Sequence, residues 1–158
     1  CTHPMPTPAL IVRQEGNHAH THPFVTVYEA YKKSGPNVLG VEALQGDDGC
    51  TGVKVNTADG YADYLFSATD MQAHHPSKRV SFCGGLGLIR EKEGQIQLMY
   101  LGCGRSLKKG NFVLESDHDV YAAIYMQHGV WYYSATGPVR VKIGKETKEL
   151  NEGYNQKL

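Results

Sequence analysis

Apolar and polar residues alternate with a period of two along most of this chain, and this pattern restricts the fold more than any other feature. In "PVRVKI", Val139, Val141 and Ile143 point to one side of an extended strand, while Arg140 and Lys142 point to the other. Such alternation is expected when one face of a strand is buried and the other is in water. No stretch keeps the 3.6-residue period of an amphipathic helix. The sequence therefore predicts an all-β protein.

The alternating stretches are separated by short segments rich in glycine, asparagine and aspartate, which are typical turn residues. Strands are predicted at residues 9–14, 23–32, 38–45, 51–57, 61–68, 78–83, 86–92, 95–102, 111–115, 119–127, 129–135 and 138–143. Turn signals between them include "GDDG", "EKEG", "KKGN" and "QHG". Many short strands with regular turns predict an antiparallel β-sandwich, jelly-roll-like, with about 10–12 strands.

The chain has 158 residues, a normal length for one domain. A fold of this size buries roughly 70% of the surface that its unfolded chain exposes, so neither a disulfide nor a metal is required for stability. The opening "CTHPMPTP" carries prolines at positions 4, 6 and 8, a composition typical of a linker. We therefore predict a linker remnant at residues 1–8 and a single β-sandwich domain at residues 9–158.

Sixteen basic and sixteen acidic residues give a formal net charge of zero. Nucleic-acid binding favours a clustered basic excess, so nucleic acid is not an expected partner. No run approaches the roughly 18–20 consecutive apolar residues that cross a bilayer as a helix, so no membrane association is predicted. The four cysteines form no CxxC pair. Cys83 and Cys103 can pair if their strands are neighbours, but free, mostly buried thiols are the favoured prediction.

Three histidines, His18, His20 and His22, precede the predicted strand at residues 23–32. In an extended segment they project from one face roughly 7 Å apart, a geometry in which neutral imidazoles can bind a metal. A cupin barrel would need a glutamate shortly after an HxH pair, and that glutamate is missing. The favoured interpretation is a polar connection into the strand. These histidines are therefore only weak metal candidates, and no cofactor is predicted.

Sequence motifs for other catalytic chemistry are absent. There is no GxSxG nucleophile elbow and no P-loop, and "CGGLG" at residues 83–87 falls between strands rather than before a helix. The densest titratable cluster is Asp117, His118 and Asp119 in "SDHDVY", which we interpret as a turn before a strand. His74 and His75 in "MQAHHPSK" are expected to lie in a solvated loop. The sequence therefore predicts no catalytic residue.

Ten tyrosines and one tryptophan are many for a domain of this size. In "VWYYSA", Trp131 and Tyr133 share one strand face, and in "DVYAAIY" Tyr121 and Tyr125 lie together. Aromatic side chains on a sheet can hold sugar rings, because the apolar face of the sugar stacks on them while its hydroxyls find polar partners. These four residues are therefore tentative carbohydrate-binding residues. The alternative, favoured for Trp131, is that they fill the interior or an interface.

The order of the predicted strands resembles that of one protein family. "PFVTVYEAY" reads as F-V-x-V-Y-E-x-Y and is followed by "VLGVEAL". The stretches "VKVNTADGYADYLFSATD", "RVSFCGGLGLIREKEGQIQLMYLGCGRSL" and "VRVKI" continue in the same order. Over residues 9–143 the chain is similar to the C-terminal β-sandwich region of the heparinase II/III-like polysaccharide lyases, whose relatives include alginate lyases.

The resemblance implies a parent enzyme that cleaves uronic-acid polysaccharides by β-elimination, between an α/α toroid and a central sandwich. No helical stretch here matches the toroid and the family's metal-binding sequence is missing, so no catalytic or zinc residue is carried over. The implied role is a non-catalytic accessory domain that supports the catalytic domains of the parent chain. Those domains are its expected partners, with acidic polysaccharide as a further candidate. The resemblance also implies a periplasmic or secreted bacterial protein.

Two alternatives stay open beside the accessory role. A carbohydrate-binding module would expose Trp131, Tyr133 or other tyrosines in a line. A small metal-dependent β-barrel enzyme would join the histidine cluster to carboxylates in a pocket. An accessory domain would instead carry an apolar patch on one of its faces.

Overall fold

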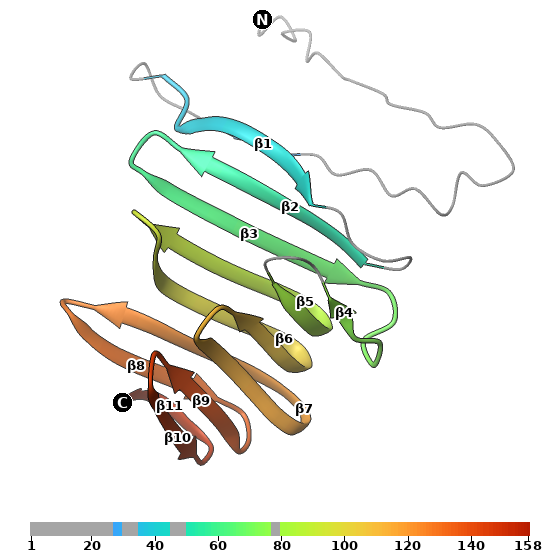
Figure 1. Cartoon of the computed structure of the whole chain (residues 1–158), viewed down its shortest axis with the longest axis vertical. Helices are drawn as coiled ribbons and strands as arrows, with labels where there is room; N and C mark the ends of the chain where they lie inside the picture. Colours follow the sequence, from blue (N-terminus) through green and yellow to red (C-terminus); the bar gives the residue numbers. More distant parts are fainter. Residues whose placement is uncertain (1–26, 30–34, 45–49, 77–79) are drawn as a thin grey trace, which may run out of the picture.

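The computed structural model describes residues 27–29, 35–44, 50–76 and 80–158, and in these ranges the chain is all-β (Figure 1). Eleven strands form one antiparallel sheet, and the described ranges contain no helix. The strands are β1 (Val38–Leu44), β2 (Cys50–Thr57), β3 (Tyr61–Ala68), β4 (His75–Pro76), β5 (Ser81–Lys92), β6 (Gln95–Lys109), β7 (Phe112–Gln127), β8 (Val130–Ala135), β9 (Val139–Ile143), β10 (Glu146–Leu150) and β11 (Gly153–Lys157). The predicted all-β class is confirmed.

Most strands that are neighbours in the sheet also follow one another in the chain. The order is β1-β2-β3-β5-β6-β7-β8-β11, while β4 pairs with β5, β9 with β7 and β10 with β9 (Figure 1). Two hairpins turn through a pair of residues with positive φ: Glu93 and Gly94 at 51° and 78°, and His128 and Gly129 at 51° and 77°. Positive φ at both positions matches the right-handed twist of the flanking strands. The turn signals "EKEG" and "QHG" are thus confirmed.

The three longest strands, β5, β6 and β7, share a bend, which falls near the start of β5 and further inside β6 and β7. The pairing register shifts after Cys83 in β5 and on both sides of Gly104 in β6. The two backbones come very close here, because a Cβ atom added to Gly104 would lie 2.6 Å from the carbonyl oxygen of Cys83. Irregularities of this kind bend strands and let them pass from one layer of a fold to another.

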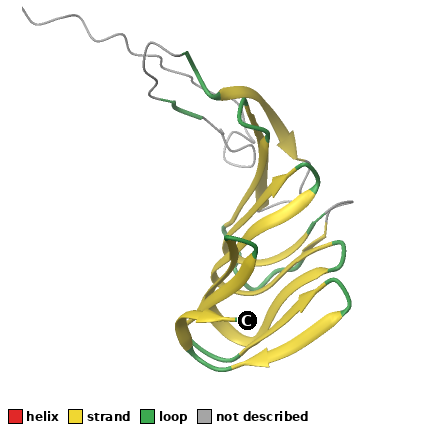
Figure 2. Ribbon diagram, turned by 90° about the vertical axis from the view of Figure 1, so that its left-hand side faces the viewer, coloured by secondary structure: helices red, strands yellow, loops and turns green. Residues whose placement is uncertain are grey.

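The bend divides the sheet into two layers that face each other across the core (Figure 2). The first layer contains β1, β2, β3, β8 and β11 with residues 86–92, 95–102 and 120–127. The second layer contains β4, β9 and β10 with residues 81–83, 106–109 and 112–115. The largest fully buried side chains come from both layers: Phe82, Ile89, Met99, Leu101, Leu107, Leu114 and Ile124. This arrangement is consistent with the predicted sandwich, although both layers belong to one continuous sheet and the strand order does not establish a jelly roll.

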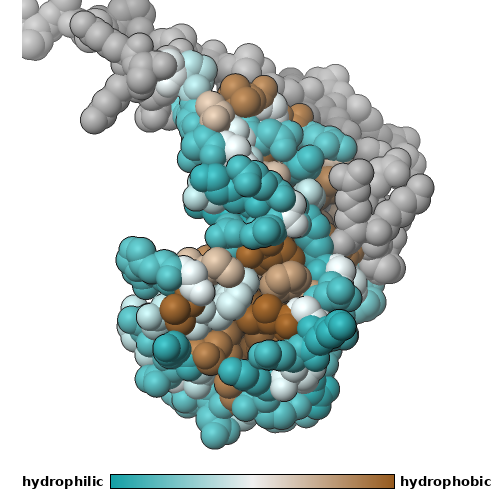
Figure 3. All heavy atoms as spheres, turned by 60° about the vertical axis from the view of Figure 1, so that its left-hand side comes forward, coloured by the Kyte–Doolittle hydropathy of each residue, from teal (hydrophilic) through white to brown (hydrophobic). Residues whose placement is uncertain are grey.

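Contacts between charged and aromatic side chains join the two layers. Nζ of Lys109, from the second layer, lies 2.7 Å from Oε1 of Glu91 and 3.4 Å from the ring centroid of Tyr64, both in the first layer. The rings of Phe112 and Trp131 make a second contact between the layers, with centroids 6.0 Å apart. On the face that Figure 3 shows, apolar side chains gather in the lower part of the molecule, where β8–β11 lie.

The bend also explains where strand prediction fails. The sequence predicts separate strands at residues 78–83 and 86–92, and again at 111–115 and 119–127, but each pair is one continuous strand. The interpretation of Asp117, His118 and Asp119 as a turn is therefore wrong, because they lie within β7 where it passes the bend. The short, polar strands β4, β10 and β11 carry no clear alternation and were not predicted.

The predictions for the N-terminal part are largely untested. The linker remnant at residues 1–8 and the strand at 9–14 lie outside the described residues. Of the strand predicted at residues 23–32, the structure describes only residues 27–29, which are not in a strand. The domain boundary at residue 9 stays a prediction.

Candidate functional site

A groove of about 550 Å³ lies on the outer surface of the second layer. A row of side chains runs along it, contributed by neighbours in register on β5, β6, β7, β9 and β10: Cys83, Ser106, Glu115, Arg140 and Glu149. Residues in register on adjacent strands share one face of a sheet. Because Leu107 and Leu114, their chain neighbours, are buried in the core, this row lies on the opposite, outer face.

The charges of the row are paired with one another and with Lys108 of β6. Oε2 of Glu115 lies 2.7 Å from Nζ of Lys108, and Oε1 accepts a hydrogen bond of 3.0 Å from Arg140. Arg140 also donates to Glu149 through Nε. The hydrogen bond from Lys108, and after it that from Arg140, holds the pKa of Glu115 below its ordinary value despite partial burial. Glu115 is therefore ionised at neutral pH, which does not suit a general acid.

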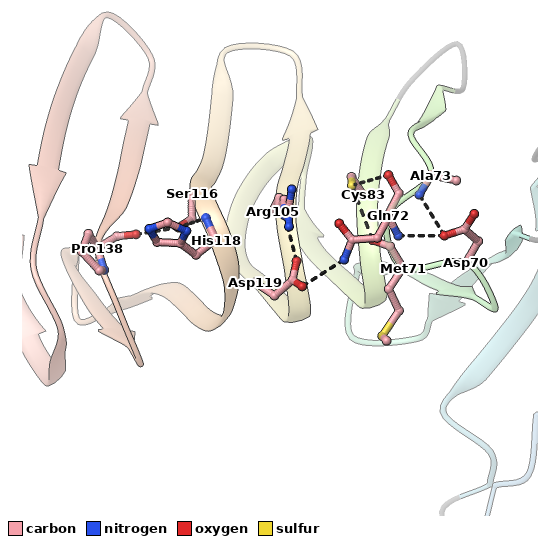
Figure 4. A network of polar contacts seen from close by, with 10 residues as sticks. All are labelled: Asp70, Met71, Gln72, Ala73, Cys83, Arg105, Ser116, His118, Asp119 and Pro138. Atoms are coloured by element: carbon pink, nitrogen blue, oxygen red, sulfur yellow. Dashed lines mark hydrogen bonds and ion pairs between the residues drawn. The ribbon is translucent and has the colours of Figure 1, made fainter.

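The segment at residues 69–74 adjoins the groove and is tied to β6 and β7 through Asp119. Figure 4 shows Arg105 and Gln72 reaching the same carboxylate: Nε of Arg105 donates to Oδ1 at 3.0 Å, and Nε2 of Gln72 donates to Oδ2 at 2.9 Å. These bonds, first from Gln72 and then from Arg105, lower the pKa of Asp119. Asp70 holds the turn itself by accepting from the backbone N–H of Gln72 and of Ala73.

Cys83 contacts the segment at residues 69–74, and its thiol points at the backbone of that segment (Figure 4). Its Sγ donates to the carbonyl oxygens of Met71 and Gln72 at 3.6 Å and 3.5 Å. Burial raises the pKa of the thiol above its ordinary value. Since the thiolate is the nucleophilic form, the environment of Cys83 suits a structural contact and not a nucleophile. Cys83 and Cys103 are both free thiols, as the sequence favours.

The two adjacent histidines of "MQAHHPSK" have different environments. His75 is buried and its ring stacks on Phe82 with centroids 6.4 Å apart, because β4 pairs it in register with that residue of β5. The prediction of a solvated loop is therefore wrong for His75. His74 is exposed beside the groove, where Nε2 lies 2.8 Å from Oγ of Ser81.

The metal candidates His18, His20 and His22 lie outside the described residues. Within the ranges that the structure does describe, no group of three histidine, cysteine, aspartate or glutamate side chains is placed to hold a metal ion. In the same ranges no helix has the length and apolar character needed to cross a membrane.

The four aromatic residues predicted for carbohydrate binding lie on two different faces. Trp131 and Tyr133 are half-buried and pack against the core. Tyr121 and Tyr125 alternate with buried residues of β7 and therefore lie on the outer face of the first layer. There Tyr125 stacks on Tyr132 of β8, with ring centroids 6.0 Å apart and planes at 18°. The structure thus separates Tyr121 and Tyr125 from Trp131 and Tyr133.

Trp131 lines a cavity of about 260 Å³ together with residues of the β9–β10 hairpin. Val141, Ile143 and Leu158 supply apolar walls, and Glu146 and Lys148 supply charges. Sequence reasoning missed the two charged residues because "ETKEL" shows no apolar alternation. The "GK" pair that follows β9 was an available turn signal, and Gly144 does turn the hairpin with φ at 65°.

The outer face of the first layer carries an apolar row that sequence reasoning also missed. Its members are neighbours in register on β2, β3, β5, β6 and β7: Val53, Leu65, Leu88, Tyr100 and Ala123. Within the row Val53 is buried and the other four residues are half-buried, and beside it Leu86 is 45% and Tyr121 is 53% exposed. Consecutive apolar residues in "YLF" and "LGLI" were the available signal, since they place apolar side chains on both faces of a strand.

Comparison with known proteins places this chain among the C-terminal domains of polysaccharide lyases. The chain belongs to the family of endo-acting ulvan lyase C-terminal domains, whose family model matches residues 38–126. It is 34% identical over 118 residues to the endo-acting ulvan lyase of Formosa agariphila, a match that covers 71% of this chain and 14% of that protein. The chain thus spans a small part of the length of this relative. No solved structure matches.

The predicted resemblance to the C-terminal β-domain of a polysaccharide lyase is confirmed by this match. The matched family is that of the ulvan lyases, and the relation to heparinase II/III-like lyases stays a prediction. The residues matched by the family model include the bend, the Asp119 network and the apolar row, and they end before Trp131 and the β9–β10 hairpin.

Proposed function

We propose that this domain is a non-catalytic accessory part of a longer, endo-acting polysaccharide lyase, which it supports by packing against the catalytic domains of the same chain. The single observation that carries this proposal is the apolar row on the outer face of the first layer. A two-layer domain needs one apolar face per layer for its core, and the other face is usually polar. A second apolar face on the same layer, with Leu86 and Tyr121 exposed beside the row, supports a further partner.

The charges around the row are arranged as in a protein interface. Arg90 donates two hydrogen bonds of 2.7 Å to Asp63 on one side of the row. Arg105 is paired with Asp119 at the bend, on the other side. Interfaces commonly place apolar side chains at the centre and polar groups at the rim. Because both ion pairs are satisfied within the domain, excluding water from them would leave none of these four charges without a partner.

The size of the matched relative supports the same role. The chain corresponds to 14% of the Formosa agariphila enzyme, and the family is described as a C-terminal domain. Most of such an enzyme therefore lies outside a domain of this kind. We propose that the parent of this chain also acts on ulvan, through catalytic domains elsewhere in its sequence. A periplasmic or secreted location is part of this proposal and rests on the resemblance found in the sequence.

The proposal is tested in the full-length parent by placing charges on the outer face. Leu86→Asp combined with Tyr121→Asp is expected to lower the thermal transition of the parent and to speed release of the domain in limited proteolysis. The same two substitutions in the 158-residue chain alone are expected to leave the thermal transition of that chain unchanged. Tyr154→Asp is the matched control, because Tyr154 is an exposed aromatic residue on β11, away from the row.

Two outcomes would overturn the proposal. One is a full-length double variant that behaves like the unmodified parent in both measurements. The other is cleavage of ulvan by the 158-residue chain alone, followed through the ultraviolet absorbance of the unsaturated product. The first result would remove the packing role, and the second would remove the non-catalytic assignment.

A second function, carbohydrate binding, is favoured by the position of Trp131. Its indole lines a cavity with apolar walls and charged groups, the combination with which proteins hold sugars. Isothermal titration of the chain with acidic polysaccharides tests this function independently of the packing role.

A further inference from the structure

Trp131 and Lys148 reach the same cavity from two different strands, β8 and β10. We propose that this cavity binds one anionic ring of an acidic polysaccharide, with Trp131 stacked on the apolar face of the sugar and Lys148 paired with its carboxylate or sulfate. The proposal deepens the second function above, carbohydrate binding, and rests on it. It is independent of the accessory role.

Trp131 is held in place before any ligand binds. Its indole packs on Phe112 of the second layer, with ring centroids 6.0 Å apart and planes at 49°. Its backbone carbonyl accepts a hydrogen bond of 2.9 Å from the N–H of Leu158. A ring that is already fixed loses little conformational entropy on binding, so most of the stacking energy contributes to affinity.

The size and lining of the cavity suit one sugar ring. About 260 Å³ lies below the roughly 300–1,000 Å³ of pockets that enclose a drug-sized ligand. Val141, Ile143 and Leu158 present aliphatic groups to the cavity, which match the C–H groups on one face of a pyranose. A longer stretch of polysaccharide would have to continue outside the cavity.

Lys148 supplies the charge that selects an anionic sugar. The ion pairs of the described residues use Arg90, Arg105, Lys108, Lys109 and Arg140 as cations, and none of them includes Lys148. Lys148 stands in register with Val141, and Glu146 stands in register with Ile143 on the same face of the hairpin. Lys148 can therefore bind an anion, while the Glu146 carboxylate accepts hydrogen bonds from sugar hydroxyls.

The chain contains a single tryptophan, so its intrinsic tryptophan fluorescence reports on Trp131 alone. The probes are alginate oligosaccharides, which carry carboxylates, dextran sulfate oligosaccharides, which carry sulfates, and unmodified dextran of matched length. We expect one or both anionic probes to change the emission on titration and dextran to bind more weakly. Comparing the two anionic probes shows which charged group is preferred.

Two substitutions test the two named residues. Lys148→Gln keeps the fluorophore, and we expect it to weaken anionic binding about fivefold and to abolish the salt dependence of the affinity. Trp131→Ala, followed by calorimetry, is expected to weaken binding about tenfold or more. If the Trp131→Ala variant does not fold, the affinities of Trp131→Phe and Lys148→Gln for the anionic probes still decide whether the two residues form the site. Lys157→Gln is the matched control, because Lys157 is an exposed lysine on β11 that does not line the cavity.

The outcomes separate this inference from the function on which it rests. Calorimetry could detect binding while the tryptophan fluorescence stays constant and Lys148→Gln binds as tightly as the unmodified chain. That result would overturn the cavity as the site, while carbohydrate binding would stand. No binding of any acidic probe would remove both carbohydrate binding and this site, and the accessory role would be unaffected.

Discussion

Gly84 and Gly104 face each other at the bend so closely that a Cβ atom added to Gly104 would lie 2.7 Å from the Cα of Gly84. No side chain fits between the two strands at this point. The pairing register of β5 and β6 shifts at this approach, where the sheet divides into its two layers (Figure 2).

Gly104→Ala is therefore expected to destabilise the chain by about 2–3 kcal/mol, since the added methyl group must push two backbones apart. For a chain of this length the thermal midpoint should fall by roughly 4–12 °C. Gly40→Ala is the control, because a Cβ atom on Gly40 of β1 would meet no atom within 4 Å. Equal midpoints for the two variants would show that the bend tolerates a side chain.

The ion pair between Lys109 and Glu91 joins the layers where both side chains are largely buried, with 13% and 14% of their surfaces exposed. Lys109→Met should lower the free energy of unfolding in urea by roughly 3 kcal/mol, because it leaves the Glu91 charge buried without a partner. Adding Glu91→Gln should restore part of this loss. A double variant as unstable as the sum of both single variants would contradict a coupled pair.

Glu115 is expected to make stability depend on pH. In the folded chain the hydrogen bonds from Lys108 and Arg140 hold its pKa below the ordinary value of 4.5 that applies to the unfolded chain. The unfolded state therefore takes up the proton first as the pH falls. The stability that Glu115 contributes is fully present at pH values above the ordinary pKa of 4.5. It is lost as the pH drops through the lower pKa of the folded state.

The measurement is urea unfolding of the unmodified chain and of Glu115→Gln between neutral pH and about pH 3. We expect the unmodified chain to be the more stable of the two at neutral pH, with the difference shrinking toward the acid end. A difference that stays constant over the whole range would show that Glu115 does not contribute to the pH dependence.

Cys83 should react slowly with alkylating reagents in the folded chain. Burial raises the pKa of its thiol, and the thiol is hydrogen-bonded to the segment at residues 69–74. We expect iodoacetamide to modify Cys103, which is half-buried, about tenfold faster than Cys83, as measured by peptide mass spectrometry. In concentrated urea the two rates should become similar. Preferential modification of Cys83 in the native chain would argue against the environment described here.

Several elements were predictable because their signals are local. The alternation in "VRVKI" gave β9 and its buried face, and "QHG" gave the turn between β7 and β8. Such patterns need no knowledge of distant residues, because the side chains of a strand alternate wherever it pairs. The ion-pair partners of Arg140, by contrast, are Glu115 and Glu149 on two other strands, and no local pattern indicates them.

The sequence by itself determined that this protein is built from antiparallel strands, where most of them lie and which side chains share a face. Only the tertiary structure decided that β5, β6 and β7 bend at Gly84 and Gly104, that Tyr121 and Trp131 lie on different faces, and that Lys148 and Trp131 line the same cavity. The physical reason is that alternation records only whether a side chain meets water or protein. The identity of its partner depends on the register of strands far apart in the chain, which the sequence does not encode locally.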